Sequence, residues 1–175
     1  FERGNAALSL EAYFRIIELK TAELFELSCR LGAEQAGYSS EFAAAAARYG
    51  RHLGTAYQIF DDVADFIGDE GRIGKTLGTD LASGKFTLPL LVLLDQLPPA
   101  ERTRLTSGIA SGTVNLDRVS ALISEYQVLP RVREYFEAEL TAGDALLEPF
   151  SGLPPVEYLG NLSRAIRSFM ARLGA

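Results

Sequence analysis

The sequence predicts an all-α fold. Apolar residues recur at spacings of three and four over long stretches, as on one face of a helix. No segment shows the sustained alternation with β-branched residues that indicates strands. The chain has 175 residues, of which 47% are apolar, so it is long enough for one domain with a sizeable core. We therefore assign residues 1–175 to a single domain.

Two long helices are expected first. One is predicted over residues 10–31, with Ser9 as its N-cap and Gly32 as its stop. The next opens at Ser39 or Ser40 and runs to about residue 67, through a run of alanines that favours helix and close packing. A glycine-rich loop is then predicted over residues 68–85, because five glycines break any long helix there.

Shorter helices are expected after this loop. A helix resumes at Thr87, where Pro89 fits a first turn. Prolines and one asparagine mark the starts of the others. These are expected at residues 100–107 after Pro98 and Pro99, from Asn115 to residue 125, from Pro130 to residue 147, and from Pro154 and Pro155 to residue 173.

Composition excludes several classes of protein. The formal net charge is −6 without a basic cluster, so we expect no nucleic-acid binding. The single cysteine, Cys29, permits neither an intrachain disulfide nor a thiolate metal site, and this usage fits a cytoplasmic protein. No apolar run approaches the roughly 20 residues that span a bilayer, so no transmembrane segment is expected.

The second long helix carries an acidic stripe. Asp61, Asp62 and Asp65 fall with Gln58 within an arc of roughly 100°, and apolar residues fill the rest of the circumference. Such a helix is expected to be buried, with its carboxylates directed into the protein. Because unpaired buried charge is costly, a cation should offset it, and Mg²⁺ suits a few carboxylates completed by water and phosphate. A solvated acidic face on a surface helix is the alternative.

Lysines accompany this stripe. Lys75, Asp80 and Lys85 lie in the glycine-rich loop, where backbone can approach a ligand closely and lysine can bind phosphate as a point charge. An exposed linker is the alternative interpretation. Lys20 and Thr21 interrupt the first amphipathic helix, and a surface lysine that snorkels from its edge is the alternative there.

Three ordered motifs together resemble the trans-isoprenyl diphosphate synthases. Residues 58–65 resemble the second DDxxD motif of that family, and residues 74–90 resemble the stretch that follows it. Upstream, Lys20-Thr21-Ala22 is similar to the family's Lys-Thr pair. The resemblance covers about residues 13–95. It implies an isoprenoid-synthase-type helical bundle and a prenyltransferase that condenses an allylic diphosphate with isopentenyl diphosphate, using Mg²⁺, to make a trans-polyprenyl diphosphate.

The resemblance also implies roles for particular residues. The metal ligands would be Asp61 directly, with Asp62 and Asp65 ligating or orienting metal-bound water. The Thr21 carbonyl and the Gln58 side chain would face the cationic carbon of the substrate. The remaining roles fall to the charged residues: diphosphate binding to Lys20, Lys75 and Lys85, and ordering of the loop to Asp80 with Lys85.

One departure from the family pattern stands out. The family's first aspartate-rich motif lies well upstream of the Lys-Thr pair, and this sequence contains no other DDxxD. We therefore expect residues 1–175 to be the C-terminal part of one polyprenyl synthase domain, without its N-terminal helices and inactive alone. The full-length protein is expected to form a homodimer. Alternatives are a non-catalytic regulatory subunit of a heteromeric prenyl synthase, a class I terpene cyclase, and a helical interaction module without a ligand.

Overall fold

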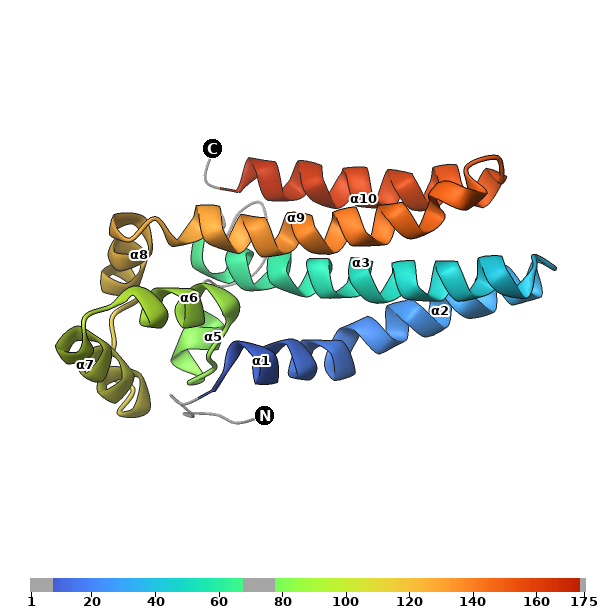
Figure 1. The fold of residues 1–175 in the computed structure, drawn as a ribbon. Coiled ribbons are helices and arrows are strands. Elements are labelled where there is room, and N and C mark those ends of the chain that lie inside the picture. Colours follow the sequence, from blue (N-terminus) through green and yellow to red (C-terminus); the bar gives the residue numbers. More distant parts are fainter. Residues whose placement is uncertain (1–7, 68–77, 174–175) are drawn as a thin grey trace. The chain divides into compact units, whose positions relative to one another are not determined.

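The structure is a computed structural model that describes residues 8–67 and 78–173, and all its regular elements there are helices, which confirms the all-α prediction (Figure 1). The α-helices are joined by one π-helix, η1, and one 3₁₀-helix, η2. In chain order the elements are α1 (Leu10–Ile17), η1 (Glu18–Ala22), α2 (Glu23–Gln35), α3 (Ser40–Ile67), α5 (Thr79–Ala82), α6 (Leu88–Gln96), α7 (Pro99–Ala110), α8 (Leu116–Glu125), α9 (Val128–Leu147), η2 (Glu148–Phe150) and α10 (Pro154–Arg172).

The predicted N-caps are confirmed. The Ser9 hydroxyl accepts the N–H of Ala12 at 3.1 Å before α1, and the Asn115 side chain accepts that of Asp117 at 2.7 Å before α8. At the start of α3, the hydroxyl of Ser39 accepts the third backbone N–H of the helix at 3.2 Å. Each cap satisfies a donor that has no partner inside its own helix.

The prediction of the first helix is wrong in two respects. A five-residue π turn, η1, interrupts it, and α2 continues through Gly32 to Gln35. Apolar periodicity does not reveal a π turn, because the spacing changes by only one residue. Gly32 keeps a helical backbone, whereas Gly37 has a φ of 77° and lies in the turn that follows α2. The chain therefore ends this helix where glycine adopts the left-handed conformation.

Three other helices differ from the predictions. The helix α5 lies inside the predicted loop, and α7 extends beyond residues 100–107 at both ends. The helix α9 begins at Val128, two residues before Pro130. Proline is tolerated anywhere in a first turn, because the N–H groups there have no intrahelical acceptor. A proline therefore marks a helix start only to within a turn.

The described chain divides into two compact units, and it passes from one to the other after Tyr13 in α1, after Phe60 in α3 and after Glu134 in α9. The first unit holds residues 8–13, 61–67 and 78–134. At its centre lies α6, where every residue from Leu88 to Leu94 is buried. The second unit holds residues 14–60 and 135–173. The assignment of the whole chain to one domain stays a prediction.

The second unit is a helical bundle. In Figure 1, α9 and α10 run alongside the long helix α3. The buried Tyr49 on α3 donates its hydroxyl to the carbonyl of Leu159 on α10 at 2.6 Å, and His52 pairs with Glu139 on α9 at 2.8 Å. Arg167 joins α10 to α9 through ion pairs with two acidic side chains. Among the described residues, no helix is both long and apolar enough to cross a membrane.

Candidate functional site

The last turns of α3 are buried, as the apolar circumference predicted. Every side chain from Asp62 to Phe66 is buried. Asp62 is 3% exposed and Asp65 is 9% exposed. Asp61 is half-buried. Asp62 and Asp65 therefore do not belong to a solvated acidic face, and the fold supplies donors to offset their burial.

The donors to Asp62 come from two other helices of the first unit. The Tyr13 hydroxyl on α1 donates to Oδ2 of Asp62 at 2.7 Å. The backbone N–H of Leu88, the first residue of α6, reaches the same oxygen at 3.4 Å. A carboxylate at a helix N-terminus also interacts favourably with the helix dipole. These contacts offset part of the cost of burying the charge.

The donors to Asp65 come from the segment that follows the loop. The Thr79 hydroxyl donates to Oδ1 at 2.9 Å, and the backbone N–H of Asp80 donates to Oδ2 at 3.1 Å. The carbonyl of Asp65 also accepts the N–H of Gly78 at 2.8 Å. Lys85 then forms an ion pair with the carboxylate of Asp80. Asp65, Asp80 and Lys85 are thus linked in one polar chain, whereas the predicted site residue Lys75 lies outside the described residues.

The phenol of Tyr13 is held in its neutral form. Tyr13 is 3% exposed, and burial, followed by the negative charge of Asp62, raises its pKa well above the ordinary value near 10. The hydroxyl therefore remains a donor to Asp62 throughout the neutral range.

A second polar cluster lies in the other unit, around Gln58. Its Oε1 accepts the hydroxyl of Thr21 at 3.0 Å, and the ammonium of Lys20 approaches it at 3.5 Å. Lys20 and Thr21 sit in the π-helix η1, and Gln58 is 5% exposed on α3. Such π turns are frequent at functional sites, because the inserted residue redirects side chains and backbone carbonyls.

Lys20 also lines an open groove of about 500 Å³ on η1 and α2. Two further cations, Arg30 and Arg51, lie along it, with exposed leucines between them. Arg51 forms an ion pair with Glu26 at 2.6 Å, so part of its charge is already neutralised. The groove therefore offers both apolar surface and cationic side chains.

Carboxylate oxygens are the ligands that hard cations such as Mg²⁺ bind. In the described part of the chain, no three acidic, histidine or cysteine side chains form a group that could hold a metal ion. Asp62 and Asp65 are engaged by protein donors, and Asp61 is the more exposed carboxylate of the motif. Mg²⁺ commonly takes one or two carboxylates and completes its octahedron with water and substrate phosphate. The motif thus supplies oxygen ligands of the type that Mg²⁺ prefers, with Asp61 as its most exposed carboxylate.

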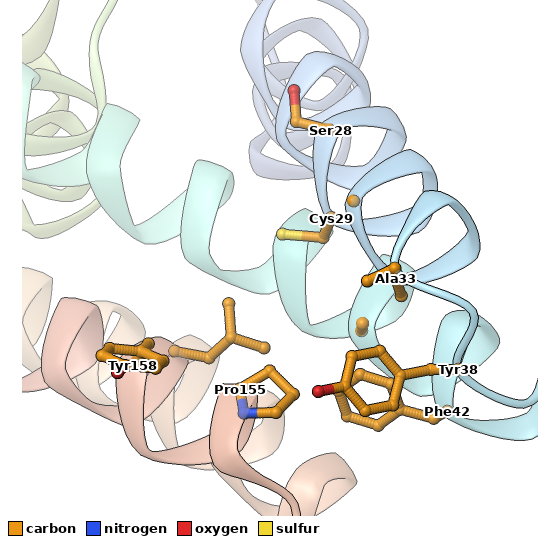
Figure 2. A pocket seen from close by; sticks show the side chains of 11 residues that line it. Ser28, Cys29, Ala33, Tyr38, Phe42, Pro155 and Tyr158 are labelled. Atoms are coloured by element: carbon orange, nitrogen blue, oxygen red, sulfur yellow. The ribbon is translucent and has the colours of Figure 1, made fainter.

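An apolar pocket lies elsewhere in the second unit, between α2, α3 and α10 (Figure 2). Its volume is about 340 Å³, and Cys29, Tyr38, Phe42 and Pro155 contribute to its lining. Burial raises the pKa of the Cys29 thiol. No charged side chain lines this pocket, so it offers no cation to a diphosphate.

Sequence reasoning missed Tyr13 and Thr79. Tyr13 fits the apolar face of its helix by spacing, and its partner Asp62 is 49 residues away. Thr79 stands beside Asp80 in the predicted loop, and only the return of the chain to α3 gives its hydroxyl a role. No local signal in the sequence distinguishes these two residues from ordinary core and loop positions.

Comparison with known proteins shows which family the chain belongs to. The model of the family described as polyprenyl synthetase matches residues 1–126. The chain belongs to the polyprenyl synthetase family. Among curated members, it is 34% identical over 155 residues to the octaprenyl diphosphate synthase of Escherichia coli, covering 87% of this chain and 48% of that one. It is 32% identical over 153 residues to heptaprenyl diphosphate synthase component 2 of Geobacillus stearothermophilus, covering 87% and 47%.

Solved polyprenyl synthases share the fold of this family member. A polyprenyl synthase from Caulobacter crescentus, complexed with calcium and isoprenyl diphosphate, superposes with a TM-score of 0.87 at 28% identity, over 99% of this chain and 53% of that one. A polyprenyl synthase from Roseobacter denitrificans gives 0.84 at 28% identity, over 98% and 56%. The chain thus spans about half the length of the synthases it matches.

Proposed function

We propose that this protein, as part of a polyprenyl diphosphate synthase, transfers prenyl groups. The reaction would condense an allylic diphosphate with isopentenyl diphosphate to give a trans-polyprenyl diphosphate. The observation that carries the proposal is the contact of Lys20 and Thr21 with Gln58 at 3.5 and 3.0 Å. The family resemblance assigns these three residues to one substrate, the allylic diphosphate, although Gln58 lies 38 and 37 positions after Lys20 and Thr21. An ordinary surface lysine would have no reason to meet a buried glutamine at a π turn.

The geometry suits stabilisation of an allylic cation. Breaking the bond between the allylic carbon and its diphosphate oxygen gives a cation and pyrophosphate. The carbonyl oxygens of Thr21 and Gln58 would present their negative ends to that cation, while the Lys20 ammonium would attract the diphosphate. The double bond of isopentenyl diphosphate then supplies the electron pair of the new carbon–carbon bond. Loss of one proton restores a double bond in the product.

The aspartate motif is proposed to bind Mg²⁺. When bound, Mg²⁺ neutralises the negative charge that develops on the departing pyrophosphate. Asp61 would be the direct ligand, and Asp62 and Asp65 would ligate the ion or orient its water. Both loop lysines, Lys75 and Lys85, are proposed to bind the diphosphate. Lys85 is also proposed to order the segment through Asp80. The solved relative that holds calcium and isoprenyl diphosphate supports this class of ligand.

Catalysis by this chain alone is not proposed. The sequence contains one DDxxD motif, and the chain spans about half of the synthases it matches. We infer that turnover requires the remaining half of the fold, which would supply the second set of metal ligands. A non-catalytic subunit is the competing proposal. It gives no reason to keep the half-buried Asp61 beside the two buried, hydrogen-bonded aspartates.

Ligand binding tests the proposal in the chain as it exists. Unfolding is followed by circular dichroism with Mg²⁺ and pyrophosphate, each alone and together. At about tenfold excess over the dissociation constant, the pair should raise Tm by about 3–5 °C, and Asp61→Asn should remove this shift. Asp95→Asn, at an exposed aspartate of α6, is the matched control and should keep it. An unchanged Tm at millimolar ligand would contradict the proposal.

A chimera tests the reaction itself. The half of the Escherichia coli octaprenyl diphosphate synthase that this chain does not match would be joined to the chain. We expect the chimera to elongate an allylic diphosphate with isopentenyl diphosphate, and expect Asp61→Asn to abolish this. A chimera that folds and binds Mg²⁺ with pyrophosphate but makes no product would favour the non-catalytic alternative.

A further inference from the structure

We propose that Tyr13 is a positioning residue that, with the backbone N–H of Leu88, holds Asp62 as a buried brace between α1, α3 and α6. Holding Asp62 in this way fixes the direction of Asp61, the aspartate proposed above as the direct ligand of the divalent cation. The brace itself contributes to the stability of the fold, whether or not a cation binds. Its consequence for the cation rests on the proposed function and deepens it, because it divides the roles within the aspartate motif.

The first argument is the convergence of two donors on one oxygen. The Tyr13 hydroxyl and the Leu88 N–H both reach Oδ2 of Asp62, at 2.7 and 3.4 Å. Both Tyr13 and Asp62 are 3% exposed. A buried carboxylate is tolerated when protein donors replace its water, and a charged acceptor makes each such bond stronger than a neutral one. Oδ2 therefore already has the partners that a structural carboxylate requires.

The second argument is the topology of the contact. Tyr13 and Leu88 lie 49 and 26 residues from Asp62 in the sequence. One carboxylate thus ties the start of α1 and the first turn of α6 to the end of α3. The phenol also fills core volume, so that its hydroxyl is held in place by packing as well as by the hydrogen bond. The brace can exist only once all three helices have come together.

The third argument concerns Asp61 and Asp65. Adjacent residues on an α-helix point about 100° apart, so a helix that turns Asp62 into the core turns Asp61 away from it. Asp61 is accordingly half-buried. Asp65 is engaged separately, by the Thr79 hydroxyl and the Asp80 N–H at 2.9 and 3.1 Å. Two aspartates of the motif therefore anchor neighbouring segments, and their anchoring fixes the direction of the third.

Tyr13→Phe tests the brace directly. The substitution keeps the ring and removes only the hydroxyl, which leaves the buried carboxylate short of one donor. We expect a lower Tm and faster hydrogen exchange at the amide of Leu88, relative to the amide of Leu91, which bonds to the carbonyl of Thr87, the residue before α6. The matched control is Tyr126→Phe, which removes a half-buried phenol that bonds to Glu101 at 3.2 Å in the same unit. It should leave the Leu88 exchange rate unchanged.

A double-mutant cycle makes the test specific. Tyr13→Phe and Asp62→Asn are compared singly and together by urea denaturation. If the hydroxyl acts through the carboxylate, the double variant loses clearly less stability than the sum of the two single losses. Additive losses, together with an unchanged Leu88 exchange rate in Tyr13→Phe, would overturn the brace.

Binding of Mn²⁺ with pyrophosphate, measured by electron paramagnetic resonance, distinguishes a residue that positions the motif from one that binds the ion directly. Asp61→Asn should abolish measurable binding. Tyr13→Phe and Asp62→Asn should each weaken it about tenfold, as the loss of outer-shell partners does, and the double variant should bind no more weakly than Asp62→Asn. The division of roles would be overturned if Asp62→Asn abolished binding while Tyr13→Phe bound Mn²⁺ as tightly as the unmodified chain. If the unmodified chain binds no Mn²⁺, the proposed function fails for this chain, and the exchange and denaturation results still decide the brace.

Discussion

A Cβ placed on Gly54 would stand 2.8 Å from the Cα of Ala22. The π-helix η1 therefore lies directly against α3, with backbone facing backbone, one turn before Gln58. Gly50, one turn earlier on α3, faces the carbonyl of Phe25 in the same way, with a Cβ distance of 2.5 Å. These two glycines permit the close approach through which Thr21 reaches Gln58.

Gly54→Ala should therefore destabilise the protein. A methyl group at this position forces backbone apart, and overpacking of this kind costs about 1–3 kcal/mol of the free energy of unfolding, measured by urea denaturation. Gly32→Ala is the control, because its Cβ would meet nothing within 4 Å and Gly32 lies inside α2. It should stabilise the protein by about 0.5–1 kcal/mol. Equal effects of the two substitutions would show that the close approach is not as described.

The hydrogen bond between Thr21 and Gln58 leads to a second prediction. Thr21→Val keeps the shape of the side chain but removes the hydroxyl that donates to the buried Gln58 oxygen at 3.0 Å. We expect a loss of about 1 kcal/mol in the free energy of unfolding. Thr21→Ser retains the hydroxyl and should lose less. If the valine variant were as stable as the serine variant, the hydroxyl would have no structural role.

Asp65→Asn should loosen the segment after the loop. An amide offers one acceptor oxygen, whereas the Asp65 carboxylate uses both of its oxygens, for Thr79 and for the N–H of Asp80. The expected loss is about 1–3 kcal/mol in urea denaturation, with faster hydrogen exchange at the Asp80 amide. The control Asp95→Asn changes an exposed carboxylate of the same unit and should stay within about 0.5 kcal/mol of the original protein.

The raised pKa of Tyr49 predicts that the protein loses stability at alkaline pH. Burial raises its pKa from about 10 to about 12, while its hydroxyl donates to Leu159. Below pH 10 both the folded and the unfolded states keep the proton, so the contribution is fully present. Between about pH 10 and 12 only the unfolded state releases it, and stability falls by about 1.4 kcal/mol per pH unit.

Urea denaturation across this pH range checks the sign and the size. Tyr49→Phe should start from a lower stability, because it loses the bond to Leu159, but its slope between pH 10 and 12 should be shallower by about 1.4 kcal/mol per unit. Tyr158→Phe removes a phenol that is 72% exposed and serves as the control. An identical slope in Tyr49→Phe and in the original protein would refute the assignment.

The sequence alone determined the fold class and the capped helix starts. Ser9, Ser39 and Asn115 each satisfy an N–H two or three residues away, so their role is contained in a few consecutive positions. The burial of α3 was predictable for the same reason. Helical periodicity is a local property, and an acidic stripe on an otherwise apolar helix is visible in ten residues. The motifs that resemble the prenyl synthases are equally local.

Only the tertiary structure decided which donors the two buried aspartates meet. Tyr13 and Leu88 reach Asp62 from 49 and 26 residues away, and neither carries a pattern that marks it as a partner. The π turn at Lys20 and Thr21 was likewise not predictable from periodicity, and its close approach to Gly54 brings together residues far apart in the sequence. Contacts between distant segments are set by packing and by the need to pair buried charge, and these conditions arise only when the helices are assembled.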